Sequence, residues 1–326
     1  MDEENGNHRR ERPADRTVRR CVDLLLKQVT GMDEEKLIEM ISAAVVRVLK
    51  EESQGGAPRE SAGAGAEPAA EDLTVLTDLT SPEYKQKLTV PDAENDLALR
   101  AMKGATTARV GIGRAGLRQT TKAMLAFRAD FAMAKDAVMK PVDEAFLRKL
   151  GLPTLLTKCS DINVHLTRPD LGRQLSEEAL RFLHEECIQN PQIQIYVSDG
   201  LSNSAIEHNA ADLLPVLMDG LKEQGVKTGT PFFVKYGRVP TMDAVSEAVG
   251  AEVTCVLIGE RPGLAAADSM SAYITYGAHT GIPESSRTVV SNIHKNGIQP
   301  VEAGAYLVDL LLRILSEKKS GVDLKL

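Results

Sequence analysis

Strand-like and helix-like segments alternate along the C-terminal part of this chain, and that alternation constrains its fold more than any other feature. The strand-like runs are short and rich in β-branched and aromatic residues, and they lie at 193–200, 230–239, 252–263 and 271–277. The stretches with helical patterning lie at 204–224, 241–249 and 300–317. Strands that alternate with helices form a mostly parallel sheet with both faces covered, so we predict an α/β domain over residues 186–326.

The part of the chain before this domain differs from it in composition and divides into further segments. Residues 92–150 are rich in Ala, Met, Leu and Lys, which favour helix formation. Apolar residues recur at helical spacing between Met32 and Lys50, and the following stretch, ESQGGAPRESAGAGAEPAAED, has the composition of a flexible linker. We therefore predict a disordered or helical extension, an amphipathic helix, a linker, a helical subdomain and the sheet domain at 1–31, 32–50, 51–91, 92–185 and 186–326.

The overall composition disfavours several classes of function. The net charge of −7 and the sequence pI near 5.5 argue against broad binding of nucleic acid or of anionic membranes. The absence of Trp and the aromatic content of 4% disfavour base-stacking surfaces. The four widely spaced Cys residues indicate a reduced cytoplasmic chain with no zinc site. We expect no secretory signal and no membrane span, because the N-terminus lacks an apolar segment and no apolar run is long enough.

A glycine-rich stretch, VGIGRAGL (110–117), matches the G-x-G-x-x-G pattern of a dinucleotide-binding turn. Such a turn binds a cofactor between a strand and a helix, with an acidic residue about 20 positions later at the end of a second strand. The candidate acid, Asp130, lies inside the helical pattern FRADFAMAKD, and the stretch lies outside the alternating region. We therefore interpret the stretch as a tight turn before a helix, and an NAD-binding oxidoreductase is kept as an alternative.

Polar and glycine-containing segments follow three of the predicted strands, at 198–202, 236–239 and 259–263. Ligands of open α/β folds bind at the edge where the carboxyl ends of the strands meet, so we expect these segments and the polar segment 285–294 to line one rim. The sequence has no motif for a nucleophile elbow, a phosphate loop or a zinc protease, and Cys255 lies in an apolar strand, as an inert core thiol does. The sequence therefore indicates a chain that holds a ligand while another chain performs the chemistry.

Several segments resemble those of one family, in the same order and with the same spacing. They are GRAG (113–116), LTRPDLGR (166–173), SDGLSNSAI, GTPFFVKYGRV, GERPGL, RTVVSNIHKNG and PVEAGAYLVDLL. On these segments the chain is identified as a member of the ethanolamine ammonia-lyase small (light) chain family, and the resemblance extends from about residue 95 to the C-terminus. Gly111 then completes the dinucleotide pattern by accident.

The resemblance implies an adenosylcobalamin-dependent lyase that converts ethanolamine to acetaldehyde and ammonia. A partner large chain, a TIM barrel, then carries the substrate and the catalytic residues, so we expect no catalytic residue on this chain. The small chain is similar to a Rossmann-like domain that closes over the cobalamin between the two subunits.

The cobalamin contacts of the family fall at Val239, Glu260 and Val289 of this sequence. The resemblance implies that Glu260 accepts hydrogen bonds from corrin amides and that Val239 offers apolar contact to the ring. At Val289 it implies packing or a main-chain contact. Some relatives have Cys at the position of Val289, so a thiol contact is absent here. The motif D-x-H-x-x-G, whose His replaces the cofactor's own base on cobalt, is absent as well, and we therefore expect base-on binding.

The amphipathic helix at 32–50 and its linker are similar to peptides that direct enzymes into bacterial microcompartments, and the family's small chain often begins with such a helix. We therefore expect a cytoplasmic location in an ethanolamine-utilisation microcompartment, with the helix in contact with shell or cargo. Residues 1–31 resemble an upstream extension, either from an alternative start site or as a second docking helix. A non-catalytic scaffold that has kept the fold and lost the cofactor is a further alternative, against which the intact GERPG segment argues.

Overall fold

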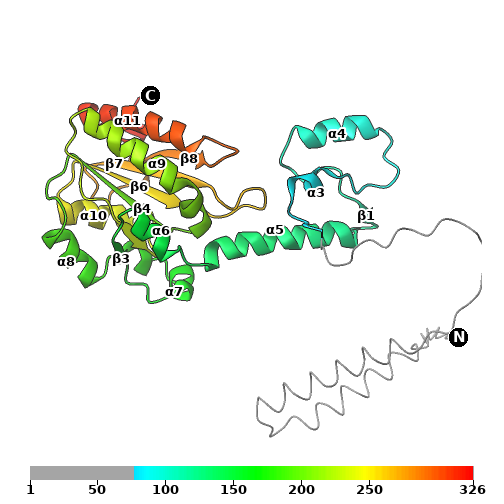
Figure 1. Cartoon of the computed structure of the whole chain (residues 1–326), viewed down its shortest axis with the longest axis horizontal. Coiled ribbons are helices and arrows are strands. Elements are labelled where there is room, and N and C mark those ends of the chain that lie inside the picture. The colour runs from blue at the N-terminus through cyan, green and yellow to red at the C-terminus, as the bar shows by residue number, and fades with distance from the viewer. Residues whose placement is uncertain (1–76, 326) are drawn as a thin grey trace, which may run out of the picture. The chain divides into compact units, whose positions relative to one another are not determined.

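A computed structural model describes residues 77–325, and their main feature is a six-stranded sheet (Figure 1). Its strands are β3 (Thr154–Leu156), β4 (Ile193–Ser198), β5 (Phe233–Lys235), β6 (Val253–Gly259), β7 (Met270–Tyr276) and β8 (Thr288–Ile293). They lie side by side in the order β3-β5-β4-β6-β7-β8. The predicted extension at 1–31, the amphipathic helix at 32–50 and the linker up to residue 76 lie outside the described residues.

The sheet is parallel from β3 to β6 and antiparallel at its β8 end. β3 pairs with β5, β5 with β4 and β4 with β6 in parallel, whereas β7 runs antiparallel to both β6 and β8. The prediction of a mostly parallel sheet is thus confirmed, and all four predicted strands are present. Two strands differ from the prediction, because β3 lies in the range predicted as helical and the polar segment 285–294 contains the edge strand β8.

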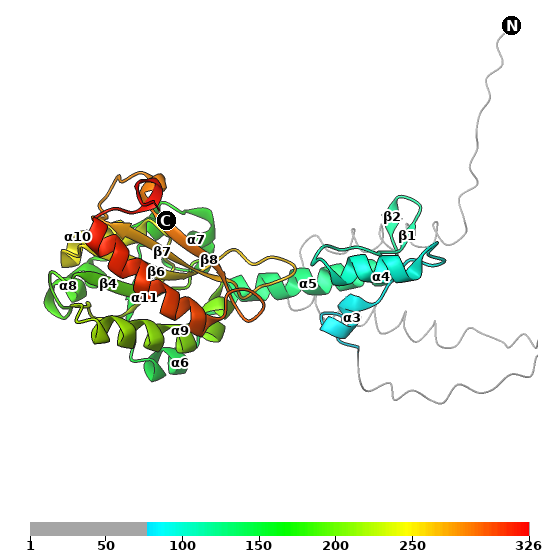
Figure 2. The same cartoon turned by 90° about the horizontal axis from the view of Figure 1, so that it is seen from above.

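Helices cover both faces of the sheet. On one face, α9 (Asn203–Glu223) and α11 (Pro300–Glu317) pack side by side, as Figures 1 and 2 show. On the other face lie α8 (Glu177–Glu185) and α10 (Thr241–Val249). The first core contains Ile195, Leu217, Leu257 and Leu311, and the second contains Leu183, Tyr196, Met242 and Val256, all fully buried. The helices α9, α10 and α11 match the predicted helical stretches to within one residue.

Local signals in the sequence set the starts of these helices. Ser202 caps α9, because its hydroxyl accepts the backbone N–H of Ala205 at 3.2 Å. Pro300 occupies the first turn of α11, where a missing N–H costs no helical hydrogen bond. Because α9 and α10 begin soon after β4 and β5, the loops that follow these two strands are short and are held at both ends.

Residues 77–139 form helices and one hairpin. The helices are α3 (Pro82–Gln86), α4 (Asp96–Gly104) and α5 (Thr121–Met139), and α3 falls within the range predicted as a linker. The long helix α5 packs against α9, where the side-chain amide of Asn203 donates to Val138 O at 3.0 Å. Shorter elements are α6 (Glu144–Lys149), α7 (Ile162–Thr167), η1 (Leu171–Arg173), η2 (Glu284–Ser286) and η3 (Gly321–Asp323).

The glycine-rich stretch forms an antiparallel hairpin, with strands β1 (Arg114–Ala115) and β2 (Arg118–Gln119). Glycine is required at position 113 because a Cβ there would lie 2.0 Å from Thr89 O, while the Gly113 N–H donates to Thr89 Oγ1 at 2.8 Å. The stretch therefore serves close backbone packing, and α5 begins directly after the hairpin. The interpretation as a tight turn before a helix is confirmed.

Asp130, the acidic residue of the dinucleotide hypothesis, is buried on α5. Its carboxylate forms ion pairs with Lys85 at 3.0 Å and with Arg109 at 2.5 Å. These pairs link α5 to α3 and to the loop before the hairpin. A carboxylate engaged by two cations in this way is not positioned to accept a ribose hydroxyl at a strand end.

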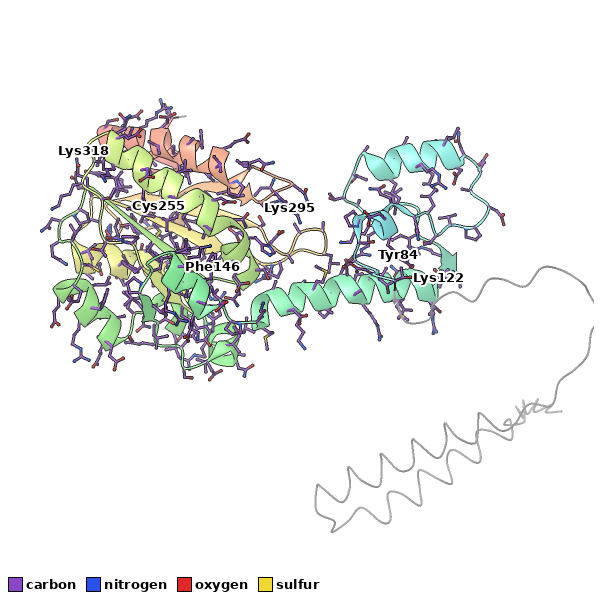
Figure 3. All side chains as sticks on the ribbon, viewed as in Figure 1. Tyr84, Lys122, Phe146, Cys255, Lys295 and Lys318 are labelled. Carbon is purple, nitrogen blue, oxygen red and sulfur yellow. The ribbon has the colours of Figure 1, made fainter. Side chains whose placement is uncertain are left out.

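Cys255 lies in β6, in the interior of the sheet (Figure 3), and is fully buried. Burial raises the pKa of its thiol to about 12, so it stays protonated and unreactive in the folded chain. The prediction of an inert core thiol is confirmed. Within residues 77–325, no helix is both long enough and apolar enough to cross a bilayer.

Candidate functional site

The loops that follow β4, β5 and β6 meet at one edge of the sheet, as the parallel arrangement requires. Leu201, after β4, donates its N–H to Gly259 O at the end of β6 at 2.9 Å. Asp199, also after β4, accepts the N–H groups of Tyr236 at 2.7 Å and of Gly237 at 3.2 Å, both after β5. The structure thus brings together three of the four segments predicted to line a rim.

Glycine at position 200 is needed for this close approach of the loops. Its φ is 56°, and a Cβ there would lie 2.4 Å from Gly259 O and 2.5 Å from the Ile258 side chain. Any side chain would therefore separate the β4 and β6 loops. Gly200 of the predicted rim therefore serves the packing of one loop on another.

Asp199 fixes the conformation of the loop after β5. It is buried, and desolvation raises the pKa of its carboxyl to about 7, although the N–H groups of Tyr236 and Gly237 oppose that rise. Tyr236 adopts φ 63°, a left-handed conformation that is uncommon for a residue with a side chain. The hydrogen bond from its N–H to Asp199 stabilises that conformation and so orients Gly237, Arg238 and Val239.

His165, at the end of α7, connects the same two loops and was not identified from the sequence. Its ring is fully buried, with Nδ1 at 3.0 Å from Tyr236 O and Nε2 at 2.6 Å from Gly200 O. A neutral ring donates to only one of these carbonyls, whereas an imidazolium donates to both. Burial lowers the pKa of His165, and the two carbonyl contacts oppose that shift. Arg238 donates to His165 O at 2.6 Å, so a side chain of the loop after β5 also contacts α7 directly.

The three residues expected to contact a cofactor, Val239, Glu260 and Val289, come from three different elements. Val239 lies after β5, is half-buried and packs against the core under α10. Glu260 follows β6 and is half-buried, and Val289 lies on β8 with 45% of its surface exposed. In the sheet register Val289 lies opposite Tyr273, which itself lies opposite Val256 of the same core. Val239 and Val289 therefore belong to the α10 side of the sheet.

Tyr273 connects Glu260 to this face. Its phenol Oη donates to Glu260 Oε1 at 2.8 Å, and its ring packs against the core under α10. Burial and the neighbouring carboxylate of Glu260 raise the pKa of Tyr273 to about 12, so the phenol remains a hydrogen-bond donor. The prediction of a strand at 271–277 assigned no role to this side chain.

A buried ion pair attaches the β8 strand to α10. The guanidinium of Arg287, two residues before Val289, donates to both carboxylate oxygens of Asp243 at 2.8 and 2.9 Å. Glu284 accepts from the same guanidinium at 2.7 Å. The Arg287 side chain is only 2% exposed and that of Asp243 8%. This pair holds the edge strand, and with it Val289, against the helix that begins just after Val239.

The fourth predicted rim segment, 285–294, lies differently from the prediction. Residues 288–293 form the edge strand β8, with Val289 inside the strand. Only Ile293, at its C-terminal end, lies beside Met270 and so near the end of β6 and the rim. The prediction that the whole segment lines the rim is therefore wrong. The reason is that Thr288, Val290 and Ile293 are buried, so the segment forms an edge strand with one covered face.

The side chains gathered here suit binding better than acid–base chemistry. Apolar contact comes from the two valines, and Glu260 presents a hydrogen-bond acceptor that is not fully buried. The buried titratable groups, Asp199 and His165, are engaged by main-chain atoms.

Residues 96–325 match the model of a family described as ethanolamine ammonia-lyase light chain. The chain is similar to the ethanolamine ammonia-lyase small subunits of Fusobacterium nucleatum and Clostridium tetani, with 51% and 52% identity over 252 residues, or 77% of this chain and 85% of each relative. The small subunit of Clostridium perfringens is 43% identical over 311 residues, which cover 95% of this chain and 99% of that relative.

Proposed function

The chain belongs to the ethanolamine ammonia-lyase light-chain family, and we propose that it holds adenosylcobalamin against the catalytic large subunit of that lyase. As a small subunit of an ammonia-lyase, it acts within a heteromeric complex. We propose that this complex converts ethanolamine to acetaldehyde and ammonia, with the catalytic residues on the large subunit. The burial of Asp199 and His165 supports this division, because neither group is free to exchange a proton with a substrate.

The observation that carries the proposal is the arrangement of Val239, Glu260 and Val289 beside one side of the sheet. A corrin is a broad ring with apolar faces and with primary amides on its peripheral side chains. A carboxylate accepts amide N–H groups, and the exposed Val289 and half-buried Val239 favour apolar contact that excludes water. The chemistry of these three residues thus fits the cofactor.

When bound, the cofactor supplies the cobalt–carbon bond on which its radical chemistry depends. The role proposed for this chain is to orient one side of the corrin and to keep water from it. The sequence lacks D-x-H-x-x-G, so no His of that motif replaces the benzimidazole, and we propose base-on binding. Residues 186–326 would then act as a Rossmann-like domain and residues 92–185 as a helical subdomain before it, with β3 of that range joining the sheet.

We also propose that the segment at 32–50 directs the complex into an ethanolamine-utilisation microcompartment by contact with shell or cargo. Its support is the amphipathic pattern followed by a linker in the sequence. A reporter protein fused to residues 1–76 tests this directly, in cells that assemble the compartment. Compartmental foci that are lost when 32–50 is deleted support the proposal, and diffuse fluorescence of the intact fusion contradicts it.

Cofactor binding is tested with the full chain in complex with its large subunit, by titrating adenosylcobalamin and following the visible spectrum. We expect a base-on spectrum from the complex and a Kd that Val289→Asp raises at least tenfold, because the change puts a charge against an apolar ring face. Val301→Asp is the matched control, since Val301 is 53% exposed on α11, on the opposite side of the sheet. Equal affinity of the wild type and Val289→Asp would contradict the assignment of this face.

The NAD-binding alternative loses its support with the glycine-rich stretch, which forms a hairpin, and with Asp130, which is ion-paired. The scaffold alternative predicts a complex that assembles but binds no cobalamin. The titration of the complex with adenosylcobalamin therefore distinguishes the two, because only the proposed function predicts binding.

A further inference from the structure

We propose that Tyr273 is a positioning residue that holds the carboxylate of Glu260 in the orientation needed to accept a corrin amide. The inference rests on the proposed function, because it assigns a role beside the same site. It starts from the hydrogen bond between Tyr273 Oη and Glu260 Oε1, at 2.8 Å.

The strand register places Tyr273 between the elements that carry the expected contacts. On β7 it lies opposite Val256 of β6 on one side and opposite Val289 of β8 on the other. Its ring is half-buried and packs against the core under α10. A tyrosine anchored in this way has a fixed ring, so its hydroxyl is a donor at a defined place next to the loop after β6.

Glu260 needs such a donor because its own main chain fixes only the start of the side chain. The Glu260 N–H donates to Ser269 O at 3.0 Å, which closes the loop between β6 and β7. Beyond that point the side chain has three rotatable bonds, and an unrestrained carboxylate loses rotamer freedom when a ligand binds. The Tyr273 hydroxyl engages one oxygen, Oε1, and so orients the second oxygen before the ligand arrives.

The phenol keeps this role throughout the physiological pH range. Burial and the Glu260 carboxylate raise the pKa of Tyr273 to about 12, so the hydroxyl stays protonated and donates. In the part of the chain that the structure describes, Tyr273 is the side chain that hydrogen-bonds to Glu260.

The test uses the full chain in complex with its large subunit and measures the Kd of adenosylcobalamin for four versions: wild type, Tyr273→Phe, Glu260→Ala and the double variant. We expect Tyr273→Phe to raise the Kd about tenfold, equivalent to about 1.4 kcal/mol. In the Glu260→Ala background we expect Tyr273→Phe to change the Kd less than twofold, because its effect passes through the missing carboxylate. A residue that only stabilises the strand would not show this dependence on Glu260.

Tyr276→Phe is the matched control. Tyr276 lies on the same strand, is also half-buried and packs against the core on the α9 and α11 side. Loss of its hydroxyl should leave the Kd within twofold of wild type. Thermal unfolding of all variants, measured in parallel, shows whether each one folds.

Two results would overturn the role of Tyr273 and leave the proposed function intact. One is an unchanged Kd for Tyr273→Phe, and the other is an equal increase with and without Glu260. A wild-type complex that fails to bind adenosylcobalamin would instead overturn the proposed function, and the inference with it.

Discussion

The ion pair between Arg287 and Asp243 gives the sharpest prediction about stability. Replacement of Arg287 by Met removes the cation and leaves the Asp243 carboxylate, whose side chain is 8% exposed, without its charged partner. Breaking a buried pair from one side costs about 3–5 kcal/mol, because an uncompensated charge stays in the interior. With about 2–4 °C per kcal/mol for a domain of this size, the melting temperature should fall by roughly 10 °C.

Urea denaturation followed by circular dichroism measures this change as a free energy of unfolding. The matched control is Arg313→Met, which removes an exposed pair with Glu317 on α11, at 2.8 Å and with side chains 44% and 39% exposed. Exposed pairs contribute at most about 1 kcal/mol, so the control should lose far less stability. The double variant Asp243→Leu with Arg287→Met should regain most of the loss, since it removes both charges and fills the space with apolar atoms.

If Arg287→Met lost less than about 1 kcal/mol, the value of an exposed pair, the pair would not act as a buried one. A double variant as unstable as the sum of the two single variants would show the same. The pair attaches β8 to α10, so Arg287→Met should also weaken cobalamin binding by displacing Val289, even in molecules that remain folded.

Three further predictions concern the rim and the proposed contact. Gly200→Ala should lose more stability in urea denaturation than Gly225→Ala. Both glycines have a positive φ, 56° and 72°, which costs Ala roughly 1–2 kcal/mol, but only at position 200 would the Cβ also lie 2.4 Å from a backbone atom, Gly259 O, so the total there should reach about 3 kcal/mol or more. In the folded chain Asp199 keeps its proton up to a pKa of about 7, whereas in the unfolded chain it loses that proton near pH 4. Between pH 4 and 7 the free energy of unfolding of wild type should therefore fall by up to about 1.4 kcal/mol per pH unit relative to Asp199→Asn, and it should fall no further above pH 7. Parallel stability curves for the two proteins would contradict this. Glu260→Ala should weaken cobalamin binding more than it lowers the melting temperature, and unchanged affinity with lost thermal stability would contradict the contact.

The main layers of the fold could be predicted from the sequence because their patterns are strong and local. The stretch 300–317 has a proline at its start and a long apolar face, and it forms α11 with these bounds. The apolar runs around Ile195 and Val256 are buried on both faces, so they can only be central strands. The alternation of such runs with helices then fixes a mostly parallel sheet.

The edges of the sheet could not be predicted, because edge strands are short and only partly apolar. β3 has three residues and is recognisable only through its pairing with β5. β8 carries two consecutive exposed polar residues, Ser291 and Asn292, so this stretch resembles a loop in the sequence. The antiparallel direction of β7 follows from the connection after β6, which has no helix and is too short for a parallel crossover, although alternation alone suggested a parallel strand.

The candidate site was predicted in part. The segments after β4, β5 and β6 could be found because glycine and polar residues follow apolar strands there. The roles of His165 and Tyr273 could not be found, because each depends on contacts across the fold, from His165 to Gly200 O and from Tyr273 to Glu260. The family resemblance supplied Val239, Glu260 and Val289, and only the fold shows that Val239 and Val289 belong to the same side of the sheet.

The most direct test of the central claim is ethanolamine deamination with adenosylcobalamin, measured for this chain alone, for its large chain alone and for the two combined. The account predicts that only the combined chains form acetaldehyde and ammonia and that they co-purify as one complex. Turnover by the large chain alone at the rate of the combined chains, or failure of the two chains to associate, would contradict it.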